Sequence, residues 1–373
     1  MNEHRHDGLS RLALAGQRFA RSGSCLVADF RRRTGHRFGE ICLRPSHPPS
    51  APSRRRLLAI LALIGLALSP ARAGEGGQEA PKEPLHLVLA TATPGGGFPA
   101  YGEALAAAIR EASPDITLEL RASKGSTENL DLLRGGRVDL GLVQGEYAYE
   151  ALAGQGTAPA VTVVAPVYSA PGVFVVPADG PVAAFDDLRG RPVALGTRSS
   201  GLTAMGRTVL RGAGLDPDHD IRPILLDHAG DGPAMLRDGR AAALWGGGTG
   251  WPGFRAAAAA PGGARFLGPP AAAIPAILAA SPSLRRMTVP AGTFPGQRGA
   301  IDTVGSWSFI LGRPGLDPGA VARLVAAIDA ARPALARRQP HERPSDPRDL
   351  ADAVPAGWLH PATASYLRQA GTP

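Results

Sequence analysis

Cysteine is nearly absent from this 373-residue chain, and the only two, Cys25 and Cys42, both lie in the first 50 residues. The remaining sequence therefore offers no disulfide framework, no thiolate zinc site and no cysteine nucleophile. Aromatic residues make up only 5% of the chain, whereas 48 Gly and 36 Pro predict many turns. After residue 73 there is no run of about 20 apolar residues, the length that a membrane helix needs. We therefore expect a soluble globular product.

The sequence patterns of several catalytic and metal sites are also missing. Neither a Gly-x-Ser-x-Gly turn nor a triad or HExxH spacing of histidines follows residue 73. The glycines at 95–97 lack the Lys-Ser/Thr pair of a phosphate loop and match a dinucleotide fingerprint poorly. The aspartates of residues 186–187 and 216–220 could ligate calcium, but the second segment lacks the glycine and distal glutamate of an EF-hand loop, so a solvated turn is expected. We expect no enzyme, no metal and no cofactor, although four hydroxyl residues could be suspected as nucleophiles: Ser126, Thr127, Ser199 and Ser200.

Positive charge is concentrated at the start of the chain. The formal net charge is +8, from 40 Lys+Arg and 32 Asp+Glu. Residues 1–73 hold 13 of the basic and 4 of the acidic residues, which leaves 27 against 28 for the other 300 residues, a net charge of −1. Basic clusters interleaved with aromatics are missing from that part, so nucleic acid is not an expected partner.

The basic leader has the organisation of an export signal. Three arginines at 54–56 precede an apolar run at 57–68, and residues 70–73 end in Ala-Arg-Ala, which places small residues at the two positions of a cleavage site. We expect cleavage after Ala73, a polar tether over residues 74–84, and a product that is free in the periplasm because no cysteine follows for a lipid anchor. The general and the twin-arginine export routes both remain open.

Residues 116–144 pack strand, polar turn, helix and strand into one short unit. Residues 116–120 alternate like a half-buried strand, and residues 138–143 read as a buried one. Between them Gly125 tolerates an unusual backbone angle, and Ser126 is expected to be the N-cap of a helix that ends at Gly135. The turn after a strand's carboxyl end exposes amide N–H groups at a positive helix terminus, which suits an anion. An ordinary well-capped crossover is the alternative.

Comparable turns recur along the chain, after expected strands at 85–90, 138–143, 193–195 and 241–245. Arg198 stands in one of them and could hold a carboxylate through two hydrogen bonds, and neighbouring aromatic residues could wall a pocket. A solvated arginine and core aromatics are the alternatives. The candidate ligand-binding residues in these turns are Gly96, Gly97, Phe98, Tyr101, Ser126, Thr127, Glu128, Asn129, Gln144, Tyr147, Arg198, Ser199, Ser200, Gly201, Trp245 and Gly246.

Strands alternate with helices through most of the chain, which predicts an α/β fold with two lobes. We expect residues 85–177 to form the first part of lobe 1 and residues 178–285 to form lobe 2. Residues 286–373 are expected to return to lobe 1 and to end in a C-terminal helix.

Three motifs taken together resemble one family. They are the glycine-rich loop that ends in YGEALA at 101–106, the turn KGSTENL at 124–130, and the strand VDLGLVQ at 138–144. The spacing from 188–190 through 199–201 to 212–215 and the closing segment 359–366 are similar too. Over about residues 85–370 the chain resembles the TAXI family of solute-binding proteins, which serve tripartite ATP-independent periplasmic (TRAP) transporters.

Three segments depart from the family's usual pattern. Residues 98–100 read FPA where the family has paired tyrosines and a proline, and residues 198–202 read RSSGL where it has Gly-x-Gly-Thr. The acidic residue that usually precedes the Trp245 strand is absent.

The resemblance implies a type II periplasmic binding protein whose two lobes are joined by crossover strands and close on a small solute. It also implies an organic acid or an amino acid such as glutamate as the solute, and a TRAP-type permease as the partner. We expect a monomer that carries out no chemistry on the solute. A binding module for a sensor kinase or an ATP-driven importer, and an exported enzyme on the same scaffold, are the alternatives.

Overall fold

The computed structural model describes residues 83–154, 160–339 and 345–371. These residues belong to one unit, Gln78–Pro373. The predicted leader over residues 1–73, its cleavage after Ala73 and nearly all of the 74–84 tether lie outside the described residues.

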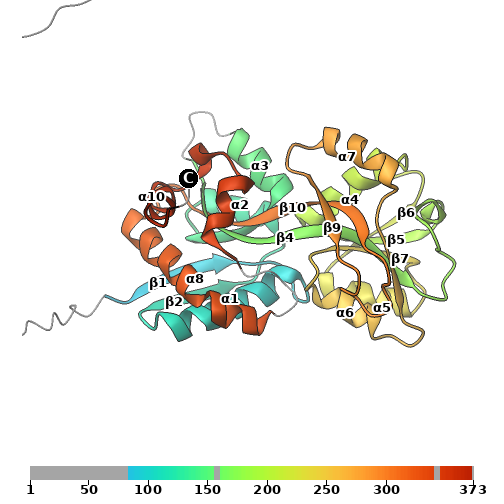
Figure 1. Cartoon of the computed structure of the whole chain (residues 1–373), viewed down its shortest axis with the longest axis horizontal. Helices are drawn as coiled ribbons and strands as arrows, with labels where there is room; N and C mark the ends of the chain where they lie inside the picture. The colour runs from blue at the N-terminus through green and yellow to red at the C-terminus, as the bar shows by residue number, and fades with distance from the viewer. Residues whose placement is uncertain (1–82, 155–159, 340–344, 372–373) are drawn as a thin grey trace, which may run out of the picture. The chain divides into compact units, whose positions relative to one another are not determined.

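Helices and strands alternate along this unit (Figure 1). The strands are β1 (Leu85–Ala90), β2 (Ile116–Arg121), β3 (Leu140–Gln144), β4 (Thr162–Pro177), β5 (Pro192–Thr197), β6 (Arg222–Leu226), β7 (Ala243–Gly247), β8 (Ala264–Leu267), β9 (Arg285–Val289) and β10 (Ile301–Gly312). The α-helices are α1 (Gly97–Ala112), α2 (Ser126–Arg134), α3 (Gly145–Ala153), α4 (Gly201–Gly212), α5 (Gly232–Arg237), α6 (Pro252–Ala258), α7 (Ile274–Ala280), α8 (Pro318–Arg338), α9 (Leu350–Ala353) and α10 (Pro361–Gln369). Short 3₁₀ turns are Phe185–Leu188, Ala229–Asp231, Ala271–Ala273, Pro347–Asp349 and Ala356–Trp358.

Two long strands connect two lobes. The strand order is β2-β1-β3-β10-β4-β7-β5-β6, with β8 on β4 and β9 on β10. Strand β4 pairs with β10 over residues 162–171 and with β7 over residues 172–175, and β10 pairs with β3 through residues 308–312 and with β9 through residues 301–305. Figure 1 shows β4 and β10 running side by side from the lobe of β1 to β3 into the lobe of β5 to β7.

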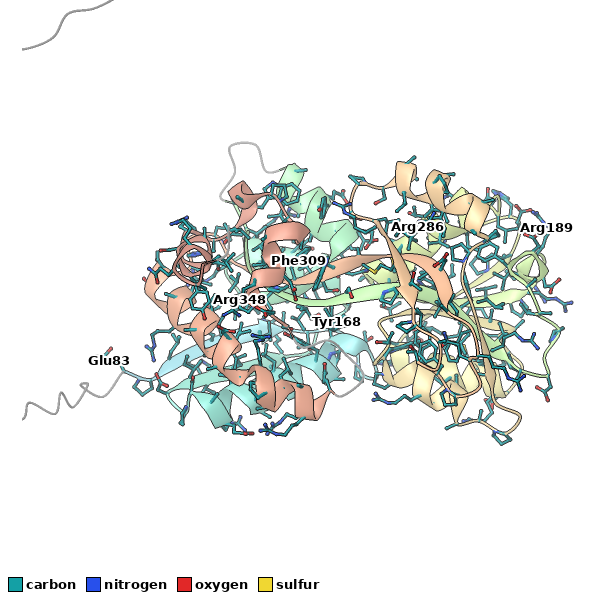
Figure 2. The ribbon with its side chains drawn as sticks, viewed as in Figure 1. Glu83, Tyr168, Arg189, Arg286, Phe309 and Arg348 are labelled. Carbon is teal, nitrogen blue, oxygen red and sulfur yellow. The ribbon has the colours of Figure 1, made fainter. Side chains whose placement is uncertain are left out.

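The sheet of each lobe is buried on both faces, as expected for parallel strands connected by helices. In the first lobe Leu89 packs on the side of α1 and α8, whereas Val143 and Phe309 (Figure 2) pack on the opposite side with α2 and α3. In the second lobe Leu195 and Leu244 belong to separate clusters on the two faces. The predicted two-lobed α/β fold is therefore confirmed. Within the described ranges no helix combines the length and apolarity needed to cross a membrane.

The start of α2 differs from the expectation. Gly125, not Ser126, is the N-cap, and its φ of 124° is one that side-chain-bearing residues rarely adopt. Ser126 is the first helical residue, and its hydroxyl accepts a hydrogen bond from the Gln144 backbone N–H at 3.1 Å instead of capping its own helix. The prediction of Ser126 as the N-cap was wrong because this tertiary hydrogen bond takes the hydroxyl away from the helix end.

The packing of residues 289 and 294 concerns the expected boundary at residue 286, where the chain was predicted to return from lobe 2 to lobe 1. Val289 and Phe294 pack in the second lobe's cluster with Phe254, and β9 pairs with the first half of β10. We propose that the chain returns to the first lobe within β10, later than residue 286, because its pairing with β3 begins only at Ser308.

Candidate ligand-binding site

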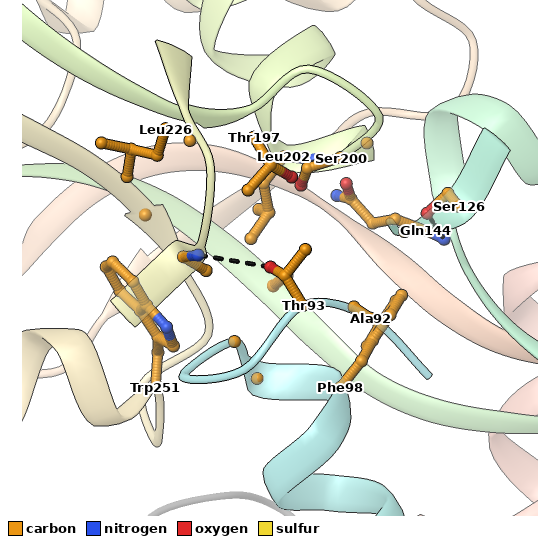
Figure 3. A pocket seen from close by; sticks show the side chains of 18 of the residues that line it. Ala92, Thr93, Phe98, Ser126, Gln144, Thr197, Ser200, Leu202, Leu226 and Trp251 are labelled. Carbon is orange, nitrogen blue, oxygen red and sulfur yellow. Dashed lines mark hydrogen bonds between the residues drawn. The ribbon is translucent and has the colours of Figure 1, made fainter. Parts of the chain in front are cut away.

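A small cavity of about 70 Å³ lies between the two lobes, at the carboxyl ends of parallel strands (Figure 3). This is where ligands bind in open α/β sheets. Both lobes contribute to its wall, which consists of Ala92, Thr93, Gly96, Gly97, Phe98, Lys124, Gly125, Ser126, Gln144, Tyr168, Ala170, Leu195, Gly196, Thr197, Ser200, Gly201, Leu202, Leu226, Ala229, Leu244, Trp245, Gly246, Trp251 and Ser308.

Four helices begin at this wall. Gly96 and Gly97 are the N-cap and first residue of α1, and Gln144 is the N-cap of α3. The starts of α2 and α4 line the cavity in the same way, at residues 125–126 and 200–201. Since the first N–H groups of a helix lack intrahelical acceptors and the terminus carries partial positive charge, the convergence favours a negatively charged guest.

The Gln144 side chain presents an unpaired acceptor. Gln144 is only 2% exposed, and its Nε2 donates to the Ser306 hydroxyl at 2.9 Å. Its Oε1 is buried without a hydrogen-bond partner among the described residues, and so is the Ser308 hydroxyl, which also lines the cavity. Buried polar atoms are seldom left unpaired, so a bound guest that supplies their partners would stabilise this site.

Aromatic rings form the apolar part of the wall. The Phe98 and Tyr168 rings lie 6.3 Å apart between centroids on the first-lobe side. On the second-lobe side, Trp245 and Trp251 have their indole N–H groups engaged by the carbonyls of Leu202, at 2.7 Å, and Gly95, at 3.2 Å. The rings therefore offer a bound guest apolar surface, and the two indole N–H groups are not free to donate to it.

The lobes meet at the rim of the cavity. The Ala229 N–H donates to Thr93 Oγ1 at 3.2 Å, the contact drawn in Figure 3, and the Gly230 N–H donates to the Pro94 carbonyl at 3.3 Å. Gly95 has a φ of 77°, and a Cβ on it would lie 2.5 Å from the Gly230 Cα, so glycine permits this approach. The two lobes are therefore in direct contact on this side of the cavity.

Charged side chains gather in an open hollow outside this rim rather than in the cavity. The hollow is lined by residues of both lobes, including Glu128, Arg198, Ser199, Asp227 and His228. Lys124 lines both spaces and is the one charged residue in the described wall of the inner cavity. Arg198 is exposed and lines only the outer hollow. The sequence suggested that Arg198 would contact the solute, but it does not line the inner cavity.

The predicted site residues therefore fall into three groups. The inner cavity brings together Gly96, Gly97, Phe98, Ser126, Gln144, Ser200, Gly201, Trp245 and Gly246. The outer hollow holds Glu128, Arg198 and Ser199. Neither space is lined by Tyr101, Thr127, Asn129 and Tyr147.

Two residues of the third group have evident structural partners. The buried Asn129 amide donates to the carbonyls of Thr91 and Leu142, both at 2.7 Å, and so ties α2 to β3 and to the end of β1. The buried Tyr101 hydroxyl lies 2.7 Å from the Ser345 hydroxyl, and burial raises the pKa of Tyr101 above its ordinary range. Both therefore support the elements behind the wall.

Several wall residues were missed by the sequence reasoning. Thr93 and Lys124 lie within turns that were singled out, so their neighbours were a usable signal. Ser308 and Tyr168 lie within the long strands β10 and β4, whose residues reach the cavity because these strands cross between the lobes. No local pattern marks them.

Among the described residues no group of three or more His, Cys, Asp or Glu side chains is placed to hold a metal ion. The aspartates at 216–220 instead bind neighbouring groups: Asp218 contacts Arg207, Asp220 contacts Arg189, and Asp216 lies 2.9 Å from His219 Nδ1. They form a surface turn of ion pairs.

Several solved structures are similar to this chain at low sequence identity. The periplasmic aliphatic sulphonate binding protein SsuA from Escherichia coli is similar at 20% identity, covering 78% of this chain and 94% of that chain with a TM-score of 0.43. MatC from Rhodopseudomonas palustris, solved with bound malate, has 14% identity over 78% of this chain and 96% of that chain, with a TM-score of 0.49. A second R. palustris protein, solved with adipate, has 18% identity over 79% and 98%, with a TM-score of 0.48. The model of the NMT1-like family matches residues 89–371, and the chain belongs to this family.

Proposed function

We propose that this chain is a periplasmic solute-binding protein that captures a small anionic solute, an organic acid or an amino acid, between its lobes. The observation that carries the proposal is the convergence of four helix N-termini, from both lobes, on one cavity. No step of chemistry on the solute is part of the proposal.

Energetics support an anion in this place. One helix N-terminus stabilises a negative charge by about 0.3–1 kcal/mol, and by up to about 2 kcal/mol when partly buried. Four of them would contribute several kcal/mol, whereas a micromolar complex needs about 8 kcal/mol. Burial against the Phe98, Tyr168, Trp245 and Trp251 rings would supply the remainder.

Entry of the solute requires the lobes to separate. The rim contacts of Thr93 and Pro94 with the 229–230 backbone close the cavity, and β4 and β10 are the two strands that would bend. A cavity of about 70 Å³ favours compact solutes of a few carbon atoms over drug-sized ligands.

For delivery we propose a TRAP-type permease, and with it membership of the TAXI group of binding proteins. This part rests on the sequence motifs at 101–106, 124–130 and 138–144 and on the export signal. The neighbouring genes test it: a large multi-span permease gene supports transport, whereas a histidine kinase gene or an ATPase gene in its place contradicts it.

A binding screen tests the solute-capture proposal. We expect some small carboxylic acids or amino acids to raise the melting temperature of the purified protein and to bind in calorimetry. Ala92→Leu should abolish that binding because it adds volume to the cavity wall, whereas Ala276→Leu, the same change on the exposed side of α7, should not. Equal binding by both variants, or turnover of the bound solute, would contradict the proposal.

A further inference from the structure

A hydrogen-bonded relay leads from the cavity wall to a carboxyl group. Gln144 Nε2 donates to Ser306 Oγ at 2.9 Å, and the Ser306 hydroxyl donates to Glu146 Oε2 at 3.1 Å. Ser306 is 1% exposed and Gln144 2%. Ser306 and Glu146 are not part of the wall, so only the Gln144 end of the relay faces the cavity.

The direction of the relay follows from the charge of Glu146. An ionised carboxylate only accepts hydrogen bonds, so the Ser306 hydroxyl must donate to it and can only accept from Gln144. The Gln144 amide then donates one N–H to the Ser306 hydroxyl, and its acceptor Oε1 lies beside the start of α4. A Cβ on Gly201 would lie only 2.6 Å from this Oε1.

Protonation reverses the direction. A neutral Glu146 can donate its O–H to Ser306 Oγ, which frees the Ser306 hydroxyl proton for Gln144. The Gln144 amide would then turn over, accept a hydrogen bond from the Ser306 hydroxyl through Oε1, and present its NH₂ group to the cavity. The side chain would change from an acceptor to a donor without moving its backbone.

The surroundings of Glu146 make both states accessible. Burial raises the pKa of Glu146 to about 7, against the opposing effect of hydrogen bonds to its own backbone N–H and to hydroxyl groups that include Ser306 and Ser283. On the same helix Tyr147 keeps a raised pKa and stays neutral in this range, and Glu150 is exposed. The nearby Arg285 guanidinium is held by the carbonyls of residues 282 and 284 and by a tyrosine hydroxyl.

We propose that Glu146, acting through Ser306, sets which end of the Gln144 carboxamide faces the cavity and thereby selects the solute. With Glu146 ionised, the site favours an anion that also carries a hydrogen-bond donor; with Glu146 protonated, it favours an anion that carries only acceptors. Gln144 is the specificity-determining residue, and Ser306 and Glu146 are its positioning residues. The selection of solute rests on the proposed function, whereas the relay does not.

The relay is tested in the protein without solute, by nuclear magnetic resonance of the Gln144 side-chain amide between about pH 5.5 and about pH 8.5. We expect its signals to shift with a midpoint of about 7. Ser306→Ala should abolish the shift, whereas Thr303→Ala, three residues along the same strand, buried and outside the cavity wall, should retain it. Signals that do not titrate, or that titrate equally in Ser306→Ala, would overturn the relay.

Selection is tested with two three-carbon probes, lactate, which carries a hydroxyl donor beside its carboxylate, and pyruvate, which carries only acceptors. Neither probe changes charge between the two pH values. We expect the ratio of their affinities to change about tenfold in favour of pyruvate from high to low pH, the effect of one hydrogen bond, and to stay constant in Ser306→Ala. An amide that titrates while the ratio stays constant would overturn the selection. Binding of neither probe would overturn both the selection and the choice of small anions as solutes, and would leave the relay standing.

Discussion

Single residues in the turns could be chosen from the sequence, but their roles depended on contacts from elsewhere in the chain. Ser126 reads as a helix cap, yet its hydroxyl receives the N–H of Gln144, 18 residues away. Arg198 reads as an anion ligand, yet it lies in the outer hollow, while Lys124 in the neighbouring turn reaches the inner wall. Local patterns predict where a helix starts better than they predict which side chain faces the guest.

The contributions of Lys124 and Arg198 to solute affinity can be compared directly, because both residues line the outer hollow and only Lys124 also lines the inner cavity. Lys124→Ala should weaken binding of an anionic solute by about three- to tenfold, because Lys124 lines the inner cavity. Arg198→Ala should change the affinity less than about twofold at physiological salt, because Arg198 lines only the outer hollow, where salt screens its charge. Calorimetry on both variants measures this, and a larger loss in Arg198→Ala would refute the assignment of the anion to the inner cavity.

Glu146 should make stability depend on pH. Its folded-state pKa of about 7 lies above its ordinary value of 4.5, so the folded protein retains a proton that the unfolded chain releases between these values. The stabilisation is fully present below about pH 4.5 and is lost as pH rises through about 7, by at most about 3 kcal/mol.

Urea denaturation of the wild type and Glu146→Gln at several pH values measures this dependence. The free energy of unfolding of the wild type should fall relative to that of Glu146→Gln as pH rises through this window. A constant difference between the two proteins would show that Glu146 has an ordinary pKa.

At the scale of elements, most helices and strands could be predicted because each carries its own periodicity and end signals. The sequence predicts a strand at 85–90 and a helix at about 232–238, and these agree with β1 and α5 within one residue. The sequence also predicts two separate strands, at 161–168 and 172–177, but β4 is continuous over Thr162–Pro177, so the predicted break between them was wrong. Its pairing with β10 and β7 holds the Pro171–Gly172 step extended, and this long-range pairing leaves no mark on the local sequence.

Gly172 marks the point where β4 leaves one lobe for the other. A Cβ there would lie 2.3 Å from the Trp245 ring, which lines the cavity, so Gly172→Ala should overpack this contact. We expect a loss of about 1–3 kcal/mol in stability together with weaker solute binding. Gly357→Ala, which meets no neighbouring atom within 4 Å, serves as the control in thermal melts and should have little effect. Equal melting temperatures for the two variants would contradict the crowding at this crossing.

For the whole molecule, the alternation of strands and helices was sufficient to predict two α/β lobes, because alternation of this kind produces parallel sheets covered by helices. The cavity could be predicted only in outline. Its helix starts follow from the sequence, but Tyr168 and Ser308 are brought to it by β4 and β10, whose course between the lobes depends on pairings across more than 100 residues.

The central claim, that the two lobes close on a small anionic solute, is tested most directly by the distance between them. Spin labels at Ala122→Cys and Asp227→Cys, one on each side of the outer hollow, would report this distance by pulsed electron resonance in a Cys25→Ser, Cys42→Ser background. Addition of a solute that binds in calorimetry should shift the distribution to a single shorter distance. A distribution that stays unchanged while the solute binds would contradict the account.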